Sequence, residues 1–153
     1  MTEKPDAVHI IHIAAPAQTV WDALTDADRS ASYFFGNRWE FGEVGGDFRV
    51  TKPDGDLDSE GKVLVREAPR LMRVTWKVVW IEELKDTPPG EVEWRLDQMG
   101  EITRLTVSEF RRPPQMAPYA EAARNGWSII LSGLKTLVET GRPMPKTLPE
   151  GPQ

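Results

Sequence analysis

The chain contains no cysteine, which excludes disulfide bonds, thiolate metal sites and cysteine nucleophiles. It has no uninterrupted apolar run near the ~20 residues that a membrane-spanning helix needs. Its first residues also lack the apolar segment of a secretory signal. Acidic residues outnumber basic ones by 24 to 19, and the resulting net charge of −5 argues against a nucleic-acid partner. Together these absences predict a soluble, cytoplasmic protein.

The length and composition predict one folded domain. A chain of 153 residues with 39% hydrophobic and 28% charged residues is neither disordered nor fibrous. Both ends are polar or rich in proline, so we expect an N-terminal tail over residues 1–7, a single domain over residues 8–141 and a loose C-terminal tail over residues 142–153.

The first part of the chain predicts a strand followed by two short helices. Val8–Ile13 is rich in β-branched residues, and Pro16 is well suited to open a helix. A second short helix is expected over Asp26–Ala31, with Asp26 as its N-cap.

Residues 38–110 alternate between apolar and charged side chains with a period of two, and turn residues separate the runs. This pattern predicts an antiparallel sheet with one apolar and one solvated face. From Pro118 to Thr140 the apolar residues instead recur at helical spacing, and Gly141 is a good residue to end a helix. The predicted fold is therefore α+β: a curved antiparallel sheet wrapped around one long C-terminal helix.

A strongly curved sheet does not close tightly on a straight helix along its whole length. Five aromatic residues are expected to point into the space between them: Trp39, Phe41, Trp76, Trp94 and Trp127. These rings either fill the space as core or line an apolar pocket, and the sequence leaves both open. Gly126 and Gly133 lie within the long helix, where they mark either a close backbone approach or tolerated surface positions.

Four segments in this order resemble one superfamily. They are Ile13-Ala-Ala-Pro-Ala-Gln-Thr-Val-Trp-Asp-Ala-Leu-Thr-Asp, Arg70-Leu-Met-Arg-Val-Thr-Trp, Thr103-Arg-Leu-Thr-Val and Asn125-Gly-Trp. They are similar to the SRPBCC (START-like, helix-grip) superfamily, in particular the branch named for the C-terminal domain of the activator of the heat-shock-protein-90 ATPase. The resemblance covers residues 8–140 and implies a cavity between sheet and helix that receives apolar or amphipathic small molecules.

Glu109 is the candidate polar group of such a cavity. The parity that places Leu105 and Val107 inside predicts that Glu109 also points inward. There it would orient a ligand or act as an acid–base group, or else lie in water at the cavity mouth or pair with an arginine such as Arg111. The full set of candidate ligand-binding residues is Trp39, Phe41, Trp76, Val78, Trp94, Leu105, Glu109, Trp127, Ile130, Leu131 and Leu134.

Other polar clusters are expected to be structural. His9 and His12 lie three apart in a strand and point to opposite faces, so they cannot share a metal or a proton relay, and we expect no inward histidine on the central strands. The acidic turn over residues 54–58 lacks the glycine and glutamate of a calcium loop, and no metal or cofactor is predicted.

The leading functional hypothesis is a non-catalytic domain that binds an apolar or aromatic small molecule. One alternative is an enzyme similar to the superfamily's cyclases or aromatases, with Glu109 as its acid–base group. Another is a co-chaperone, although we do not expect the additional N-terminal domain of the full activator. The resemblance implies a monomer or a homodimer, and an exposed Tyr33-Phe34-Phe35 segment is expected at an interface or at the cavity mouth.

Overall fold

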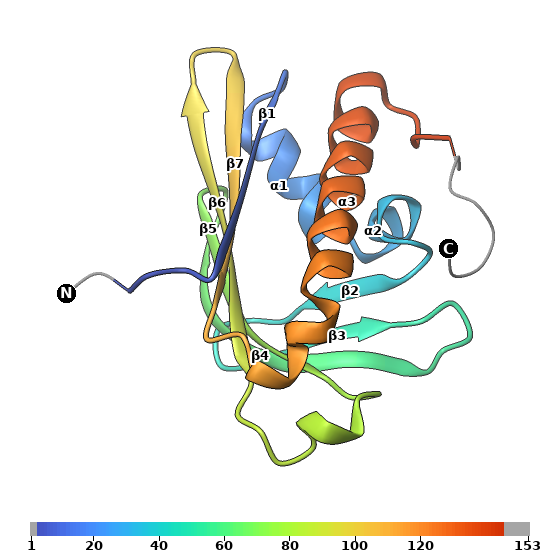
Figure 1. Cartoon of the computed structure of the whole chain (residues 1–153). Coiled ribbons are helices and arrows are strands. Elements are labelled where there is room, and N and C mark those ends of the chain that lie inside the picture. Colours follow the sequence, from blue (N-terminus) through green and yellow to red (C-terminus); the bar gives the residue numbers. More distant parts are fainter. Residues whose placement is uncertain (1–2, 146–153) are drawn as a thin grey trace.

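Seven strands form one antiparallel sheet in the order β1-β7-β6-β5-β4-β3-β2, and a long helix packs across its concave face (Figure 1). The computed structural model describes residues 3–145. The strands are β1 (Ala7–Ile13), β2 (Arg38–Phe41), β3 (Asp47–Thr51), β4 (Leu57–Glu67), β5 (Leu71–Val78), β6 (Gly90–Met99) and β7 (Ile102–Phe110). The helices are α1 (Ala17–Thr25), α2 (Ala27–Tyr33) and α3 (Ala120–Thr140), with short 3-10 helices η1 (Glu82–Leu84) and η2 (Pro114–Tyr119). The predicted α+β helix-grip architecture is confirmed.

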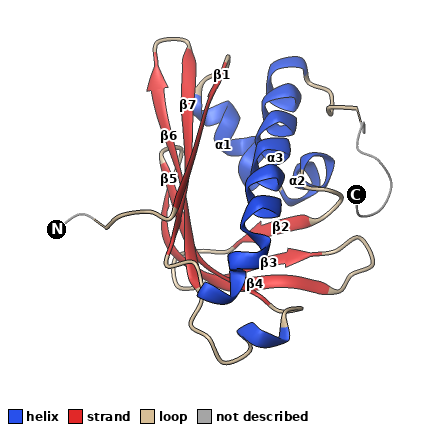
Figure 2. Cartoon of the chain, in the orientation of Figure 1, coloured by secondary structure: helices blue, strands red, loops and turns tan. Residues whose placement is uncertain are grey.

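The sheet bends because its middle strands are irregular. The register shifts between Val50 and Thr51 where β3 pairs with β4, and between Val63 and Val65 where β4 pairs with β5. Such irregularities bend a strand and increase its local twist. As Figure 2 shows, β1, β5, β6 and β7 stand to the left of α3, while β2, β3 and β4 turn across beneath its lower end.

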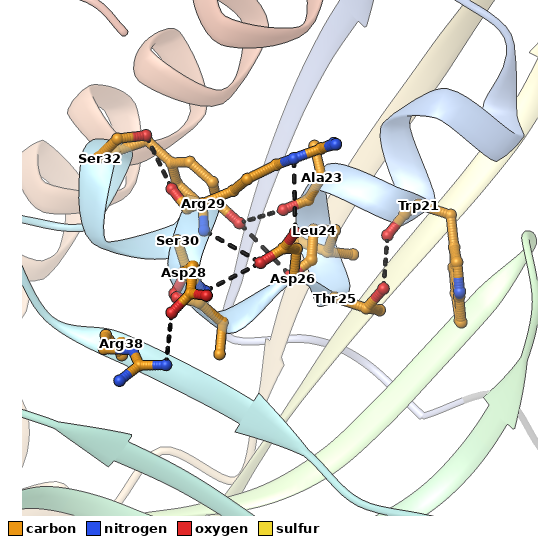
Figure 3. A network of polar contacts seen from close by, with 12 residues as sticks. Trp21, Ala23, Leu24, Thr25, Asp26, Asp28, Arg29, Ser30, Ser32 and Arg38 are labelled. Atoms are coloured by element: carbon orange, nitrogen blue, oxygen red, sulfur yellow. Dashed lines mark hydrogen bonds and ion pairs between the residues drawn. The ribbon is translucent and has the colours of Figure 1, made fainter.

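The two short helices are held by a capping network (Figure 3). Asp26 Oδ1 accepts hydrogen bonds from the backbone N–H groups of Asp28 (2.9 Å) and Arg29 (3.2 Å), which confirms its predicted role as the N-cap of α2. Arg38 Nη2 on β2 donates to Asp28 Oδ1 at 2.6 Å. In addition, the backbone N–H of Trp39 donates to Ser30 Oγ at 3.0 Å, so α2 is fastened directly to β2.

Aromatic rings fill the centre of the space between sheet and helix. Trp39 and Trp94 are both 0% exposed, and their ring centroids lie 5.5 Å apart in an edge-to-face arrangement. Trp94 also packs edge-to-face against Phe41 at 5.3 Å and against Trp127 of α3 at 6.1 Å. Edge-to-face contacts are among the favoured geometries for aromatic pairs, and this stack holds α3 against the sheet.

Two element boundaries and one expectation about exposure differ from the sequence prediction. Helix α3 begins at Ala120, because residues 114–119 form the 3-10 helix η2 that contains Pro118. The alternation of apolar and polar residues predicts a strand over residues 70–80, but β5 ends at Val78, which leaves Trp80 in the following loop with 53% of its surface exposed. The exposure expected for Tyr33-Phe34-Phe35, at the end of α2, is wrong at two of the three positions, since Tyr33 and Phe34 are buried in the core and only Phe35 is exposed.

Two residues near the N-terminal end, Glu3 and Asp6, contact the sheet and the segment that follows it. Glu3 forms ion pairs with Arg73 and Arg111, and the backbone N–H of Asp6 donates to the Glu109 carbonyl at 2.7 Å. Residues 1–2 and 146–153 of the predicted tails lie outside the described residues.

Candidate functional site

A cavity of about 250 Å³ lies between the sheet and the start of α3. The ends of β5 and β7 form one side, with Trp76, Val78 and Phe110. The opposite side comes from η2 and the first turns of α3, and the loop between β5 and β6 closes the bottom with Leu84. The lining is predominantly apolar and carries a few polar side chains, which is the usual composition of a small-molecule site.

The structure brings four of the predicted ligand-binding residues to this cavity. Trp76, Val78, Glu109 and Trp127 line its wall. The other seven are not on the cavity wall: Trp39, Phe41, Trp94, Leu105, Ile130, Leu131 and Leu134. They belong to the hydrophobic core or pack against it, because the aromatic stack fills the middle of the concave face. The empty space is therefore displaced toward the start of α3.

Glu109 points into the cavity from β7, as its parity predicts. Its Oε2 accepts a hydrogen bond from Arg112 Nη2 at 2.6 Å. The expected type of partner, an arginine, is therefore present, but it is Arg112 and not Arg111. Arg111 instead forms ion pairs with Glu3 and Glu91. Its backbone has a positive φ of 51°, so the chain turns sharply between the two arginines and presents them to different surroundings.

His9 is an inward-facing histidine on an edge strand, outside the central strands for which no inward histidine was expected. The two histidines do point to opposite faces, with His12 exposed, but His9 shares the inner face of β1 with Ile11 and Ile13. Its Nε2 lies 3.5 Å from Glu109 Oε2, and its ring centroid is 6.1 Å from that of Trp127. This Nε2 atom is buried without a hydrogen-bond partner. Because β1, although an edge strand, lies beneath α3 in the curved sheet, this histidine comes close to Glu109 and Trp127.

A second hollow of about 280 Å³ lies on the other side of this polar cluster. It is lined by the start of β1 together with Arg112, Ala120 and Arg124. The backbone N–H of Arg112 donates to Asp6 Oδ2 at 2.8 Å, which fixes this wall to the N-terminal segment. Arg112 thus separates the apolar cavity from a more polar one.

The sequence interpretation missed the residues at the cavity mouth. Trp80 lines the cavity, and its ring stacks edge-to-face on Tyr119 of η2 at 5.9 Å. The alternation that places Trp80 in phase with Trp76 and Val78 was a usable signal for it. Met116 also lines the cavity, but its segment has no period that distinguishes it from a loop.

Two classes of site find no support within residues 3–145. Among these residues no group of three histidine, aspartate or glutamate side chains is placed to hold a metal ion. None of the helices described there is both long and apolar enough to cross a membrane.

Comparisons with known proteins agree with this architecture. No curated protein matches the chain at a significant level. Among solved structures it is similar to DynU16, a protein in the dynemicin biosynthetic locus (28% identity, TM-score 0.69, 90% of this chain and 48% of that one), so the chain spans about half the length of DynU16. It is also similar to CalU16 from Micromonospora echinospora (26% identity, TM-score 0.67, 91% of this chain and 76% of that one).

An HSP90 activator from Plasmodium falciparum shares the fold, with 20% identity and a TM-score of 0.71 over 92% of this chain and 99% of that one. The model of one family, Activator of Hsp90 ATPase homolog 1-like protein, matches residues 14–139. This range begins just before α1 and ends one residue before the end of α3. The family match over residues 14–139, together with this fold, supports assignment of the chain to the SRPBCC superfamily. The chain therefore belongs to the family of Activator of Hsp90 ATPase homolog 1-like proteins.

Proposed function

We propose that the chain binds an apolar or aromatic small molecule in the cavity at the start of α3. The observation that carries this proposal is a hollow of about 250 Å³ whose wall includes three indole rings, those of Trp76, Trp80 and Trp127. Flat aromatic walls offer a large contact area to a planar ligand, and burial of apolar surface contributes roughly 25 cal/mol per Å². The position of the cavity also agrees with the expectation for the superfamily.

The six tryptophans provide an internal test of this proposal. Naphthalene is a suitable probe because it is planar and apolar. When it is titrated into the protein, we expect the indole N–H resonances of the cavity residues Trp76, Trp80 and Trp127 to shift. Those of Trp21, Trp39 and Trp94, which do not line the cavity, should shift much less. Equal shifts of all six resonances, or no shifts, would contradict the proposal.

A pair of alanines on α3 supplies matched variants. Ala123 lines the cavity, whereas its neighbour Ala122 is exposed on the same helix. Ala123→Phe should fill the space and abolish naphthalene binding. Ala122→Phe, which makes the same change in helix propensity, should bind as the wild type does.

A second candidate is an enzyme in which Glu109 is the acid–base group, and the contact between Glu109 and His9 favours it. A carboxylate beside a histidine at an apolar wall is suited to take a proton from a carbon next to a carbonyl group. The test is deuterium exchange at the α-carbon of β-tetralone, in which the carboxylate takes the proton and the enolate takes a deuteron from solvent. Acceleration by the wild type that is lost in Glu109→Gln would favour this candidate. If the wild type does not accelerate the exchange, the enzyme candidate loses its support and the binding proposal stands alone.

The family's name also suggests a chaperone partner. Retention of the chain on immobilised HSP90, together with stimulation of its ATPase, would support that alternative in place of cavity binding.

A further inference from the structure

Glu109 offers the cavity one unused hydrogen-bond acceptor. Its Oε2 accepts from Arg112 Nη2 at 2.6 Å and lies 3.5 Å from His9 Nε2. Its Oε1 accepts no hydrogen bond from any residue in the range 3–145. Because Glu109 lines the cavity, this oxygen is available to a molecule bound there.

The other charged side chains around the cavity are already engaged. Glu91 has one carboxylate oxygen on Arg73 Nε at 2.7 Å and the other on Arg111. Lys77 Nζ donates to the Lys85 carbonyl at 2.7 Å. Asp58 Oδ1 accepts from Ser59 Oγ at 2.8 Å. Glu109 and Asp58 are therefore the lining carboxylates with an oxygen that has no partner among residues 3–145, and Glu109 is the one whose other oxygen is held by an arginine, Arg112.

The surroundings of Glu109 select the chemistry of the group that this oxygen would bind. A second anion beside the carboxylate would be repelled, and a second cation would be repelled by the guanidinium of Arg112. An apolar group would remove Oε1 from water without replacing its hydrogen bond, which is costly. A neutral hydroxyl group satisfies the oxygen without adding charge, and a hydrogen bond to a carboxylate is among the strong ones.

We propose that the cavity selects a neutral aromatic molecule that carries a hydroxyl group, and that this hydroxyl donates a hydrogen bond to Glu109 Oε1. The aromatic body lies against Trp76 and Trp127, and the hydroxyl reaches the polar end of the wall where Arg112 and His9 support the carboxylate. The inference rests on the proposed function, since it concerns the ligand of the same cavity. It adds the polar group that the ligand must present.

Four probes that share the naphthalene ring system and differ in one substituent test this inference: naphthalene, β-naphthol, the methyl ether of β-naphthol, and β-naphthoate. The ether keeps the oxygen but cannot donate, so it isolates the hydrogen bond. We expect β-naphthol to bind the wild-type chain about tenfold more tightly than the ether. If no probe binds, the proposed function itself fails. If β-naphthol and the ether bind equally, the cavity binds aromatics but the inference is overturned. Tightest binding by β-naphthoate would overturn it in favour of an anion on Arg112.

Variants of Glu109 provide the second arm. Glu109→Met should remove the preference for β-naphthol over its ether while naphthalene still binds. Glu109→Gln keeps the shape and a neutral acceptor, so it should reduce the preference to a few-fold, and it serves if the methionine variant does not fold. Glu93→Gln is the control, because Glu93 lies on the same sheet but outside the cavity, paired with Arg73 and Arg95. It should keep the full preference. A preference that survives both Glu109 variants would overturn the inference.

Discussion

Gly133 of α3 lies directly against Tyr33 of α2, so that a Cβ atom added to Gly133 would be 2.9 Å from the Cβ of Tyr33. Real Cβ atoms do not approach one another this closely, and the neighbouring atom belongs to the first carbon of a buried side chain with no freedom to move aside. The absence of a side chain at Gly133 therefore allows the two helices to pack.

The same helix contains a second glycine for comparison. We expect Gly133→Ala to destabilise the protein by about 1–3 kcal/mol, because overpacking outweighs the gain in helix propensity. At Gly126 the nearest atom to an added Cβ is Phe35 Cε2 at 4.0 Å, so Gly126→Ala should stabilise the protein by up to about 1 kcal/mol. Urea unfolding of both variants measures the difference. Equal effects of the two substitutions would show that helix propensity alone decides.

Tyr33 should make stability fall in alkaline solution. Burial raises the pKa of its phenol far above the ordinary value of 10.0, and its O–H donates to the Ala23 carbonyl at 2.9 Å. The folded state thus keeps the proton, whereas the unfolded chain loses it near pH 10.0. Stability from Tyr33 is complete below that pH and declines above it, by up to ~1.4 kcal/mol per pH unit.

Tyr33→Phe should remove this decline and should cost about 1 kcal/mol at neutral pH, since the Ala23 carbonyl loses its donor. The measurement is the free energy of unfolding as a function of pH for both proteins. Tyr119→Phe is the control, because that ring is 38% exposed, and it should follow the wild-type curve. A wild-type curve that runs parallel to that of Tyr33→Phe above pH 10.0 would contradict the prediction.

Glu139 should contribute stability that is lost in acid. Its Oε2 accepts from the backbone N–H of Ala14 and from Lys135 Nζ, both at 2.7 Å, and these bonds lower the pKa of the carboxyl below its ordinary value of 4.5. The contribution is complete above pH 4.5 and disappears as the pH falls through the lowered value.

Because Glu139 is close to solvent, Glu139→Gln should cost no more than about 1 kcal/mol at neutral pH, and the wild type and the variant should become equally stable at low pH. Thermal unfolding across this range is the measurement. Glu40→Gln, at an exposed position on β2, is the control and should change little. A difference for Glu139→Gln that persists unchanged at low pH would show that the hydrogen bonds do not depend on the charge.

The contact between Trp80 and Tyr119 should control how fast a ligand leaves. The two rings meet edge-to-face at 5.9 Å and an angle of 82°, and they join the loop after β5, where Trp80 lines the cavity, to η2, where Met116 lines it. Such a pair contributes about 0.5–1.5 kcal/mol. Trp80→Ala and Tyr119→Ala should therefore each raise the dissociation rate of β-naphthol by up to about tenfold, and the double variant should add little further. NMR line shapes measure the rate, and purely additive effects would contradict a joint role.

The strands and the helix were predictable because each has one buried face. The alternation from Trp39 to Val107 and the helical spacing from Trp127 to Leu134 arise directly from which face is buried, so the pattern gives both the element and its orientation. The position of Glu109 followed from the same parity.

The location of the cavity was not predictable in this way. It depends on which rings touch: Trp39 and Trp94 fill the middle of the concave face, and no local pattern states how two aromatic residues from different strands pack. The role of His9 depended on the curvature of the sheet, which brings β1 under α3. Glu109 pairs with Arg112 and not with Arg111 because the backbone of Arg111 has a positive φ. The alternation of apolar and polar residues does not predict such a turn.

The bottom and the mouth of the cavity come from two connecting segments, the loop after β5 and η2, whereas the aromatic stack that joins α3 to the sheet lies beyond them. The length and the amino-acid sequence of these two segments can therefore change without disturbing the packing of α3 on the sheet. Relatives with this same frame are free to accommodate guests of quite different size, and an engineer who wishes to change the guest should begin with those two stretches.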